Sequence, residues 1–158
     1  MVRPMADIRW TPSLVEERIV EAVEVLKRLP EERMQGYYST WPTIVPEFSD
    51  LVGQEPSRMK RPWPSPAAID RMEETLEWPK LLDPQDARIL WLRAAGQRWK
   101  TICWKVGLQR AAAHEHWLYG LCVLAWKLNG RHVPSKRSKR YVITMVRESD
   151  LSCGAAGQ

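Results

Sequence analysis

Residues 97–130 read QRWKTICWKVGLQRAAAHEHWLYGLCVLAWKLNG, and this stretch decides the predicted fold. Its apolar residues recur at helical spacing in two blocks, 98–106 and 109–128, which Gly107 and Leu108 separate. Glycine suits a tight corner because it adopts a positive φ without the strain that a Cβ introduces. The apolar residue directly after it fills the corner. The stretch therefore predicts a short helix, a tight turn and a long helix.

The residue types also meet the requirements of a helix-turn-helix motif. In the short helix, Ile102 and Val106 lie about one turn apart and face inward. Cys103 supplies the small side chain that is needed where the two helices cross, so we expect it to be buried. The long helix carries an inward stripe at helical spacing, namely Ala113, Trp117, Leu121, Leu124 and Leu128. We therefore predict that the leading end of this long helix keeps an exposed face.

An amphipathic helix is expected near the N-terminus, over residues 13–29. Ser13 and Glu16 have the spacing of a capping box, and Pro30 ends the helix. Its acidic residues lie away from its apolar stripe, so this helix is expected to pack or to contact a partner. The apolar stripe consists of Val15, Ile19, Ala22, Val23, Leu26 and Leu29.

Two more helices are expected before the quoted stretch. The Ser-Pro pair at 65–66 and the Asp-Pro pair at 83–84 each read as an N-cap followed by the first helical residue. Asp86, in the first turn of the second of these helices, suits the positive end of the helix dipole. Gly96 stands where a left-handed C-cap belongs.

The predicted fold class is all-α: a helical bundle with a C-terminal helix-turn-helix and a basic tail. Residues 141–146, YVITMV, are expected to form one short strand or a pairing edge within that tail. A short helix is expected over 41–52 in the Pro/Trp-rich connecting segment. The expected units are the N-terminal helix (1–30), the connecting segment (31–64), the helix-turn-helix domain (65–130) and the basic tail (131–158).

Composition excludes several classes of protein. The chain has 158 residues, of which 44% are hydrophobic and 27% charged, so it can build a core and is not disordered throughout. The longest apolar-leaning stretch, 117–126, is half of the about 20 residues that a membrane span needs. The N-terminus lacks the apolar run of a secretory signal. We therefore expect a cytoplasmic protein without a membrane span.

The cysteines and histidines argue against disulfides and metal. The three cysteines have no CxxC spacing and are odd in number, which is typical of reduced thiols. His114 and His116 are two residues apart, so on a helix they face different ways. Motifs for phosphate binding, dinucleotide binding and zinc hydrolysis are all missing from the sequence. We expect no metal, no cofactor and no enzymatic activity.

Charge is distributed unevenly along the chain. Residues 81–158 carry 13 Lys and Arg against 5 Asp and Glu, whereas residues 1–80 carry 11 against 14. A basic half beside an acidic half indicates a polyanionic partner, and nucleic acid is the common one. A solvated surface with a solubilising tail is the alternative interpretation.

The stretch DPQDARILWLRAAGQRWKTICWKVGLQRAAAHEHW, residues 83–117, resembles region 4 of sigma-70 factors, their promoter-reading domain, and the related LuxR-type domains. These domains share an acid-capped first helix, a break at glycine, a short second helix, a glycine–apolar turn and a reading helix. The wider stretch from about Ser65 through AWKLNGR, residues 125–131, is similar to a family of small helix-turn-helix proteins encoded by phages and prophages of alphaproteobacteria. The resemblance implies DNA binding.

The exposed side of the 109–128 helix supplies the expected base-reading residues. Gln109 and Arg110 suit adenine and guanine edges, and His114 lies on the same exposed side. Reading helices of this type usually begin Ser-Arg and carry further arginines where Glu115 and His116 stand here. Glu115 either accepts a hydrogen bond from cytosine or repels phosphates, and the second outcome would move the surface to protein recognition.

The remaining basic residues are expected to hold the DNA backbone rather than to read its sequence. They fall on the short helix, near the end of the long helix and in the tail PSKRSKR at 134–140. The expected phosphate-binding residues are Arg98, Lys100, Lys105, Lys127, Arg131, Lys136, Arg137, Lys139 and Arg140.

The function expected from these features is sequence-specific binding of double-stranded DNA, as a transcriptional regulator of a phage or prophage. One alternative is a protein-interaction module on the same scaffold, which binds RNA polymerase or another host or phage protein. Trp104 supports this protein-interaction alternative, because its position lies off the face of Ile102 and Val106 and can be exposed to a partner protein. Another alternative is the DNA-recognition subunit of a terminase, which forms rings. The sequence leaves the oligomeric state open.

Overall fold

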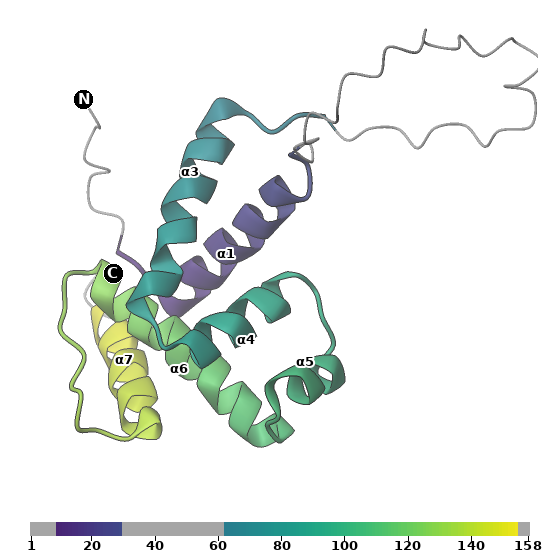
Figure 1. Cartoon of the computed structure of the whole chain (residues 1–158). Helices are drawn as coiled ribbons and strands as arrows, with labels where there is room; N and C mark the ends of the chain where they lie inside the picture. Colours follow the sequence, from purple (N-terminus) through teal and green to yellow (C-terminus); the bar gives the residue numbers. More distant parts are fainter. Residues whose placement is uncertain (1–8, 30–61, 155–158) are drawn as a thin grey trace, which may run out of the picture.

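The computed structural model describes residues 9–29 and 62–154, and every regular element in these ranges is a helix (Figure 1). The all-α prediction is confirmed. The expected helix over 41–52 lies outside the described residues. The elements are α1 (Pro12–Leu26), α3 (Pro66–Glu77), the 3₁₀ helix η1 (Trp78–Leu81), α4 (Pro84–Ala94), α5 (Trp99–Val106), α6 (Arg110–Leu128) and α7 (Lys139–Gly154). No described helix is both long and apolar enough for a membrane crossing.

The long helix α6 is the centre of the molecule. It contacts α1, α4, α5 and α7. Helices α1 and α3 pack against each other in antiparallel orientation and extend away from one end of α6 (Figure 1). The core forms where α1, η1, α4 and α6 meet, and burial of its apolar surface is the main force that holds these helices together. Its buried members are Val15, Ile19, Trp78, Leu90, Leu121, Leu124 and Ala125.

The helix starts show how far local signals decide the structure. Ser65 caps α3 as predicted, since its Oγ accepts a hydrogen bond from the backbone N–H of Ala68 at 3.3 Å. The predicted cap of α1 was wrong by two residues. Thr11 is the N-cap, and its Oγ1 accepts from the N–H of Leu14 at 3.3 Å. Pro12 then takes the first helical position, for which its fixed φ is suited.

Two glycines turn the chain as the sequence predicted. Gly96 follows the last turn of α4 and has a φ of 82°, and Gly107 is the C-cap of α5 and has a φ of 72°. Both values lie in the left-handed region, which costs other residues strain. The predicted end of α1 was less accurate, because the helix stops at Leu26 instead of residue 29.

Helices α4 and α6 approach closely at a third glycine, Gly120. A Cβ built on Gly120 stands 3.0 Å from Leu90 Cδ1 and 3.7 Å from the Cβ of Asp86. Gly120 and Leu90 are both buried, so the neighbouring side chain has little room to move. Glycine is therefore needed at this position for the spacing of α4 and α6.

We expect the Gly120→Val substitution to lower the free energy of unfolding by about 2 kcal/mol, because its side chain overpacks the α4–α6 crossing. Urea unfolding followed by tryptophan fluorescence measures the change. Ala111→Val, at an exposed position of the same helix, is the control for the lower helix propensity of valine. Equal losses in the two variants would show that the crossing is not tight.

The strand predicted near the C-terminus was wrong. Residues 141–146 belong to α7, and within them Val142, Ile143 and Val146 are buried. The β-branched residues of this stretch favour a strand by propensity, but their buried positions follow the helical period. They pack on Cys122 and Val123 of α6. Packing against α6 has thus overridden the local preference.

Helix α7 runs in the same direction as α6 and covers a second face of it. Its first residue, Lys139, lies at His116, while Ser149 accepts a hydrogen bond from Arg131 beyond the end of α6. The segment 129–138 therefore leads the chain back along α6. The sequence predicted one inward stripe on α6, and the structure adds the face under α7, which carries the buried Cys122 and Val123.

The burial of Cys122 gives a test of this packing. Burial raises the pKa of its thiol to about 11, so the reactive thiolate is scarce at pH 8. Cys103, which was expected to be buried, is half-exposed to solvent at its helix crossing. We expect iodoacetamide at pH 8 to modify Cys103 in the folded protein while Cys122 stays unmodified, as measured by peptide mass spectrometry. Rapid modification of Cys122 would mean that α7 does not cover α6.

Candidate nucleic-acid interface

The three predicted base-reading residues lie at the exposed start of α6. Gln109 is the N-cap in extended conformation, Arg110 is the first helical residue, and both are exposed. His114 is exposed one turn later. The corner at Gly107 with half-buried Leu108 places this end of α6 at the surface of the molecule.

Two tryptophan rings contact the side chain of His114. Its imidazole lies 5.5 Å from the ring of Trp99 and 5.4 Å from that of Trp117, measured between centroids. Trp99 in turn stacks under the guanidinium of Arg93 at 5.2 Å. These contacts restrict the rotamers of His114, so it offers a pre-oriented polar edge beside Arg110.

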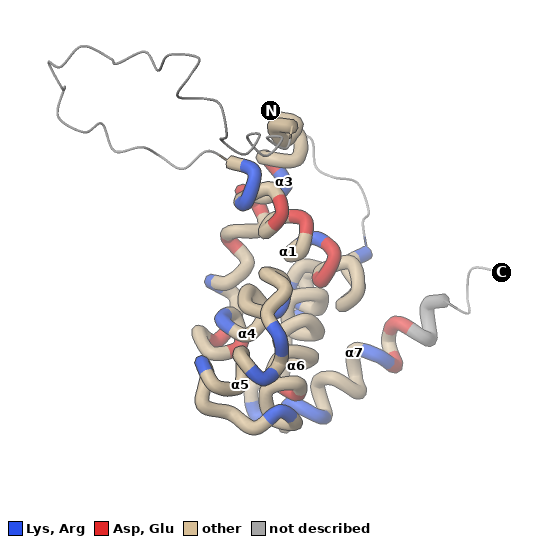
Figure 2. Tube along the Cα trace, turned by 90° about the vertical axis from the view of Figure 1, so that its right-hand side faces the viewer, with Lys and Arg blue, Asp and Glu red and all other residues tan. Residues whose placement is uncertain are grey.

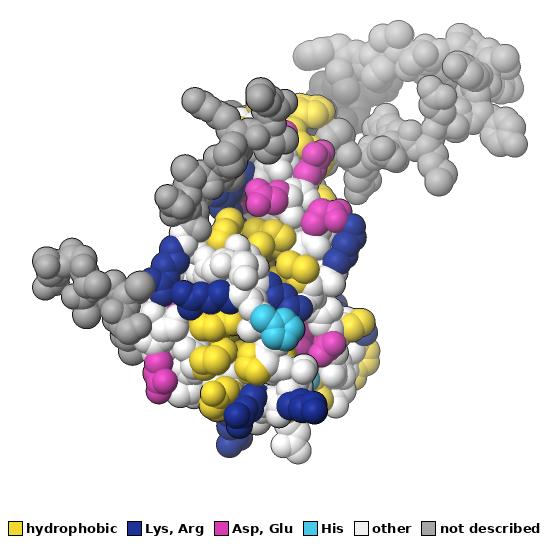
Figure 3. All heavy atoms as spheres, turned by 90° about the vertical axis from the view of Figure 1, so that its left-hand side faces the viewer, with side chains coloured by type: hydrophobic (Ala, Val, Ile, Leu, Met, Phe, Trp, Pro, Cys, Tyr) yellow, Lys and Arg dark blue, Asp and Glu magenta, His cyan; other side chains and the backbone are white. Residues whose placement is uncertain are grey.

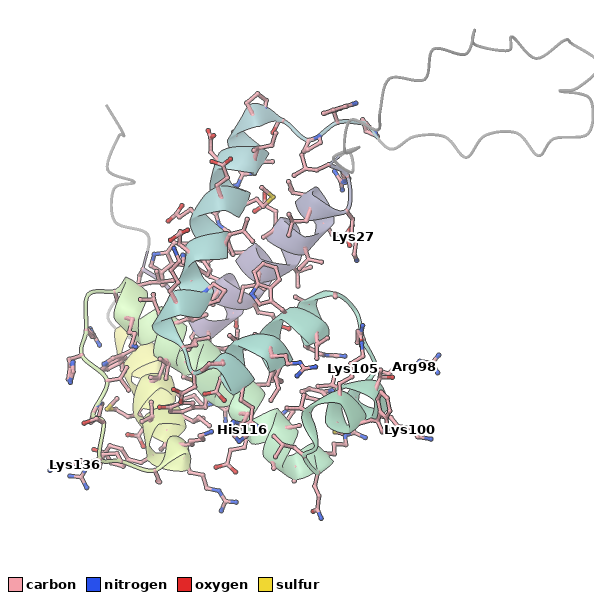
Figure 4. The ribbon with its side chains drawn as sticks, in the orientation of Figure 1. Lys27, Arg98, Lys100, Lys105, His116 and Lys136 are labelled. Atoms are coloured by element: carbon pink, nitrogen blue, oxygen red, sulfur yellow. The ribbon has the colours of Figure 1, made fainter. Side chains whose placement is uncertain are left out.

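Helix α5 carries cations on one side of this end. Arg98 and Lys100 are exposed, and Figure 4 shows both side chains pointing away from the body of the molecule. Lys105 differs, because it is half-buried and its Nζ donates a hydrogen bond to Oε1 of Gln97 at 2.9 Å. Arg98 and Lys100 are therefore the α5 cations that are available to an external anion.

The start of α7 carries cations on the other side. Lys136 and Arg137 are exposed in the segment that leads into α7, and Lys136 lies at the opposite edge of the molecule from Arg98 (Figure 4). Arg140 Nε is 3.5 Å from Oε1 of Glu115 on α6, yet its side chain is 85% exposed. The carboxylate of Glu115 thus has a positive partner.

Two of the predicted phosphate-binding residues lie elsewhere. Lys127 Nζ donates to the carbonyl oxygen of Leu81 at 2.7 Å, and the guanidinium of Arg131 stacks on Trp126 at 4.6 Å. Lys127 is 17 residues along α6 from Arg110, which corresponds to about 25 Å. The structure therefore does not bring Lys127 and Arg131 together with the cations at the start of α6.

Lys139 belongs to a cluster with Asp86 and His116 in which only the Asp86 side chain is fully buried. Asp86 is only 1% exposed, and its Oδ1 lies 2.5 Å from Nδ1 of His116 and 3.6 Å from Nζ of Lys139. Lys139 Nζ is also 2.6 Å from the same Nδ1. Asp86 Oδ2 has no hydrogen-bond partner among the described residues. This cluster joins α4, α6 and α7 beside the exposed start of α6.

The cluster changes the interpretation of all three residues. The buried carboxylate needs a compensating charge, because an isolated ion in the protein interior is strongly disfavoured. The pKa of the neighbouring Tyr119 phenol is raised, first by the burial of Tyr119 itself and then by the negative charges of Asp86 and Asp83. Sequence reasoning missed the cluster because its members come from three helices, and no spacing within one helix signals the contact.

Opposite charges gather at opposite ends of the described structure. Figure 2 shows Lys and Arg over α5 and the starts of α6 and α7, while most Asp and Glu follow α1 and α3, with some basic residues beside α3 and some acidic ones on α7. The space-filling view in Figure 3 shows acidic side chains near the upper end of one face and most basic ones below them, with further acidic side chains in the lower part. Anions that approach this molecule are therefore attracted to the end where α6 begins.

Nothing in the described ranges suggests a metal centre, since no three His, Cys, Asp or Glu side chains gather in a metal-binding arrangement there. The polar groups at the start of α6 instead offer hydrogen-bond donors and positive charge on an exposed surface. Such a surface suits a large anionic partner better than a small substrate.

Residues 27–124 match the family described as a domain of unknown function (DUF6362), and the chain belongs to this family. The matched residues include α3, α4, α5 and the first part of α6, and hence the whole corner at Gly107. Helices α1 and α7 lie outside the matched residues. No curated protein and no solved structure matches the chain.

Proposed function

We propose that this member of the DUF6362 family is a sequence-specific DNA-binding protein, in which α5, the Gly107 turn and α6 act as a helix-turn-helix. The start of α6 enters the major groove of double-stranded DNA. The observation that carries the proposal is the exposure of Gln109, Arg110 and His114 between two groups of exposed cations.

The proposed reading residues have the chemistry that base edges require. Arginine binds guanine through two hydrogen bonds, and glutamine binds adenine in the same way. Arg110 and Gln109 stand at the first positions of a helix of 19 residues, about 28 Å long, whose diameter fits the major groove. The helix N-terminus adds positive potential toward the phosphates.

The flanking cations give the backbone contacts. Arg98 and Lys100 lie on the α5 side of the start of α6, and Lys136, Arg137 and Arg140 lie on the α7 side. A helix in the major groove has a phosphate strand on each side, so cations on both sides fix its register and orientation. The two groups together hold the duplex in the proposed complex.

The pairing of Glu115 with Arg140 supports the proposal further. A free Glu115 carboxylate beside the groove would repel phosphates, and this repulsion would oppose DNA contact. Because Arg140 lies 3.5 Å from Glu115 and stays exposed, the pair is close to neutral and keeps a guanidinium at the surface. The start of α6 therefore remains an attractive surface for DNA.

The biological role that we propose is transcriptional regulation in a phage or prophage, in the cytoplasm. The support is the likeness of residues 83–117 to promoter-reading domains, together with a chain that presents one reading helix per copy. Regulation follows when the bound protein blocks or recruits polymerase at the site that α6 selects.

Selection of bound duplexes from a random-sequence pool tests the proposed function. The purified protein should enrich a short common motif over several rounds, since base contacts discriminate against the wrong base by about 1–3 kcal/mol each. The same pool selected with a Gln109→Ala/Arg110→Ala variant is the control, and its motif should be lost. Recovery of random sequences by both proteins would count against base reading.

A further inference from the structure

We infer that the outer face of α5 binds the outer face of α3 in a second copy of this chain, with Trp104 at the centre of the contact. The inference goes beyond the proposed function, because it concerns a protein contact that needs no DNA. It arises from one exposed aromatic residue and from the complementary charges at the two ends of the molecule.

The α5 face presents a large apolar side chain among cations. Trp104 is 83% exposed, more than any other large hydrophobic side chain in the described ranges. Lys100 lies one turn before it on the same side of the helix, and Arg98 is exposed at the N-cap. The sequence of α5, WKTICWKV, contains no acidic residue. An apolar and acidic surface is the complement of this face.

The α3 face of the same chain has that chemistry. Asp70, Glu73, Glu74 and Glu77 are all exposed along α3, and Leu76 among them is 38% exposed. Glu77 forms an ion pair with Lys80, while Asp70, Glu73 and Glu74 carry further negative charge on the same stretch of helix as Leu76. Figure 2 shows the same concentration of acidic residues on α3.

The two faces lie at different ends of one molecule, α5 near the start of α6 and α3 on the far side of α4 (Figures 1 and 2). One copy therefore presents its α5 face to the α3 face of the next, which is a head-to-tail contact. Such contacts use two different surfaces of each copy and can repeat into short chains. Exposed tryptophan is a frequent anchor of protein interfaces, and the charges set orientation and salt dependence.

Sedimentation velocity of the full chain without DNA tests the inference. At low salt the wild-type protein should form dimers and longer chains as its concentration rises from micromolar toward millimolar, and high salt should dissociate them. Trp104→Ala should weaken the association at least tenfold. Trp63→Ala is the matched control, because Trp63 is also exposed at 73% but lies outside both faces, and it should associate like the wild type.

A charge exchange makes the test specific. Arg98→Glu/Lys100→Glu reverses the charge of the α5 face, and Glu73→Lys/Glu74→Lys cancels the net negative charge of the α3 face, where Asp70 and Glu77 remain. Each variant alone should be monomeric, because its own α5 and α3 faces no longer attract each other. An equal mixture of the two should associate again, because the wild-type α3 face of the first variant can bind the wild-type α5 face of the second. Circular dichroism confirms that both variants fold. A monomeric wild type at low salt, or a mixture that stays monomeric, overturns the inference.

Arg98 and Lys100 belong to both surfaces, so DNA and a second copy should compete for α5, but Arg110 and Trp104 each belong to only one surface and distinguish the two proposals. Arg110→Ala should leave self-association unchanged, and Trp104→Ala should leave the affinity for a single duplex site unchanged. Loss of self-association with intact DNA binding therefore separates the two surfaces. An equal loss of DNA binding in Trp104→Ala would place Trp104 on the DNA face and reject the second-copy contact.

Discussion

The His116→Leu substitution is expected to lower the free energy of unfolding by about 3 kcal/mol, because it removes the closest partner of a buried charge. The carboxylate of Asp86 is almost completely buried, and His116 Nδ1 lies 2.5 Å from its Oδ1. Lys139 remains in the variant, but its Nζ is 3.6 Å from the same oxygen and its side chain is one-third exposed. Urea unfolding at neutral pH measures the loss.

The Asp86→Asn background separates charge from packing. Asparagine has nearly the same shape as aspartate but carries no charge, so in this background His116→Leu should cost only about 1 kcal/mol. The difference between the two losses is the coupling energy of the pair. Equal losses in both backgrounds would show that His116 acts by packing alone and that the buried charge is compensated elsewhere.

The Arg110→Ala substitution is expected to reduce the affinity for the selected DNA site by about 5- to 150-fold, which corresponds to the 1–3 kcal/mol of one bidentate base contact. Affinity for random duplex should fall much less, since Arg110 adds only one positive charge to backbone binding. Fluorescence anisotropy with the selected duplex and with a scrambled duplex measures both values. The fold should be unaffected, because Arg110 is exposed.

Arg28→Ala is the matched control for this prediction. It makes the same chemical change at an exposed position that follows α1 next to Lys27, far from the start of α6 (Figure 4). DNA affinity should stay near the wild-type value in this variant. If Arg110→Ala and Arg28→Ala weaken specific and random duplexes alike, net charge alone explains binding, and α6 reads no bases.

The parts of the fold that the sequence predicted correctly depend on residues within one or two turns. Ser65 caps α3, and Gly96 and Gly107 adopt the left-handed conformation that ends their helices. Capping and glycine conformations are set by the local backbone, so the local sequence is sufficient to predict them. The exposed start of α6 was predicted for the same reason, from its apolar stripe and the corner before it.

The parts that the sequence did not predict depend on contacts between distant elements. The stretch 141–146 reads as a strand by composition, and only its packing on α6 makes it part of a helix. Likewise, Asp86 and His116 lie on different helices, so their hydrogen bond has no pattern in the sequence. The positions of Lys127 and Arg131 also follow from the length of α6, which separates them from the α6 start.

The central claim is that cations on both sides of the α6 start hold DNA. The salt dependence of duplex binding tests this claim most directly. The exposed cations that remain after Arg140 balances Glu115 are Arg98, Lys100, Lys136 and Arg137. If each neutralises one phosphate, the logarithm of the association constant should fall by about 3.6 for each tenfold increase in salt concentration. Fluorescence anisotropy at a series of salt concentrations gives this slope. A slope near zero, or no binding at low salt, would contradict the account.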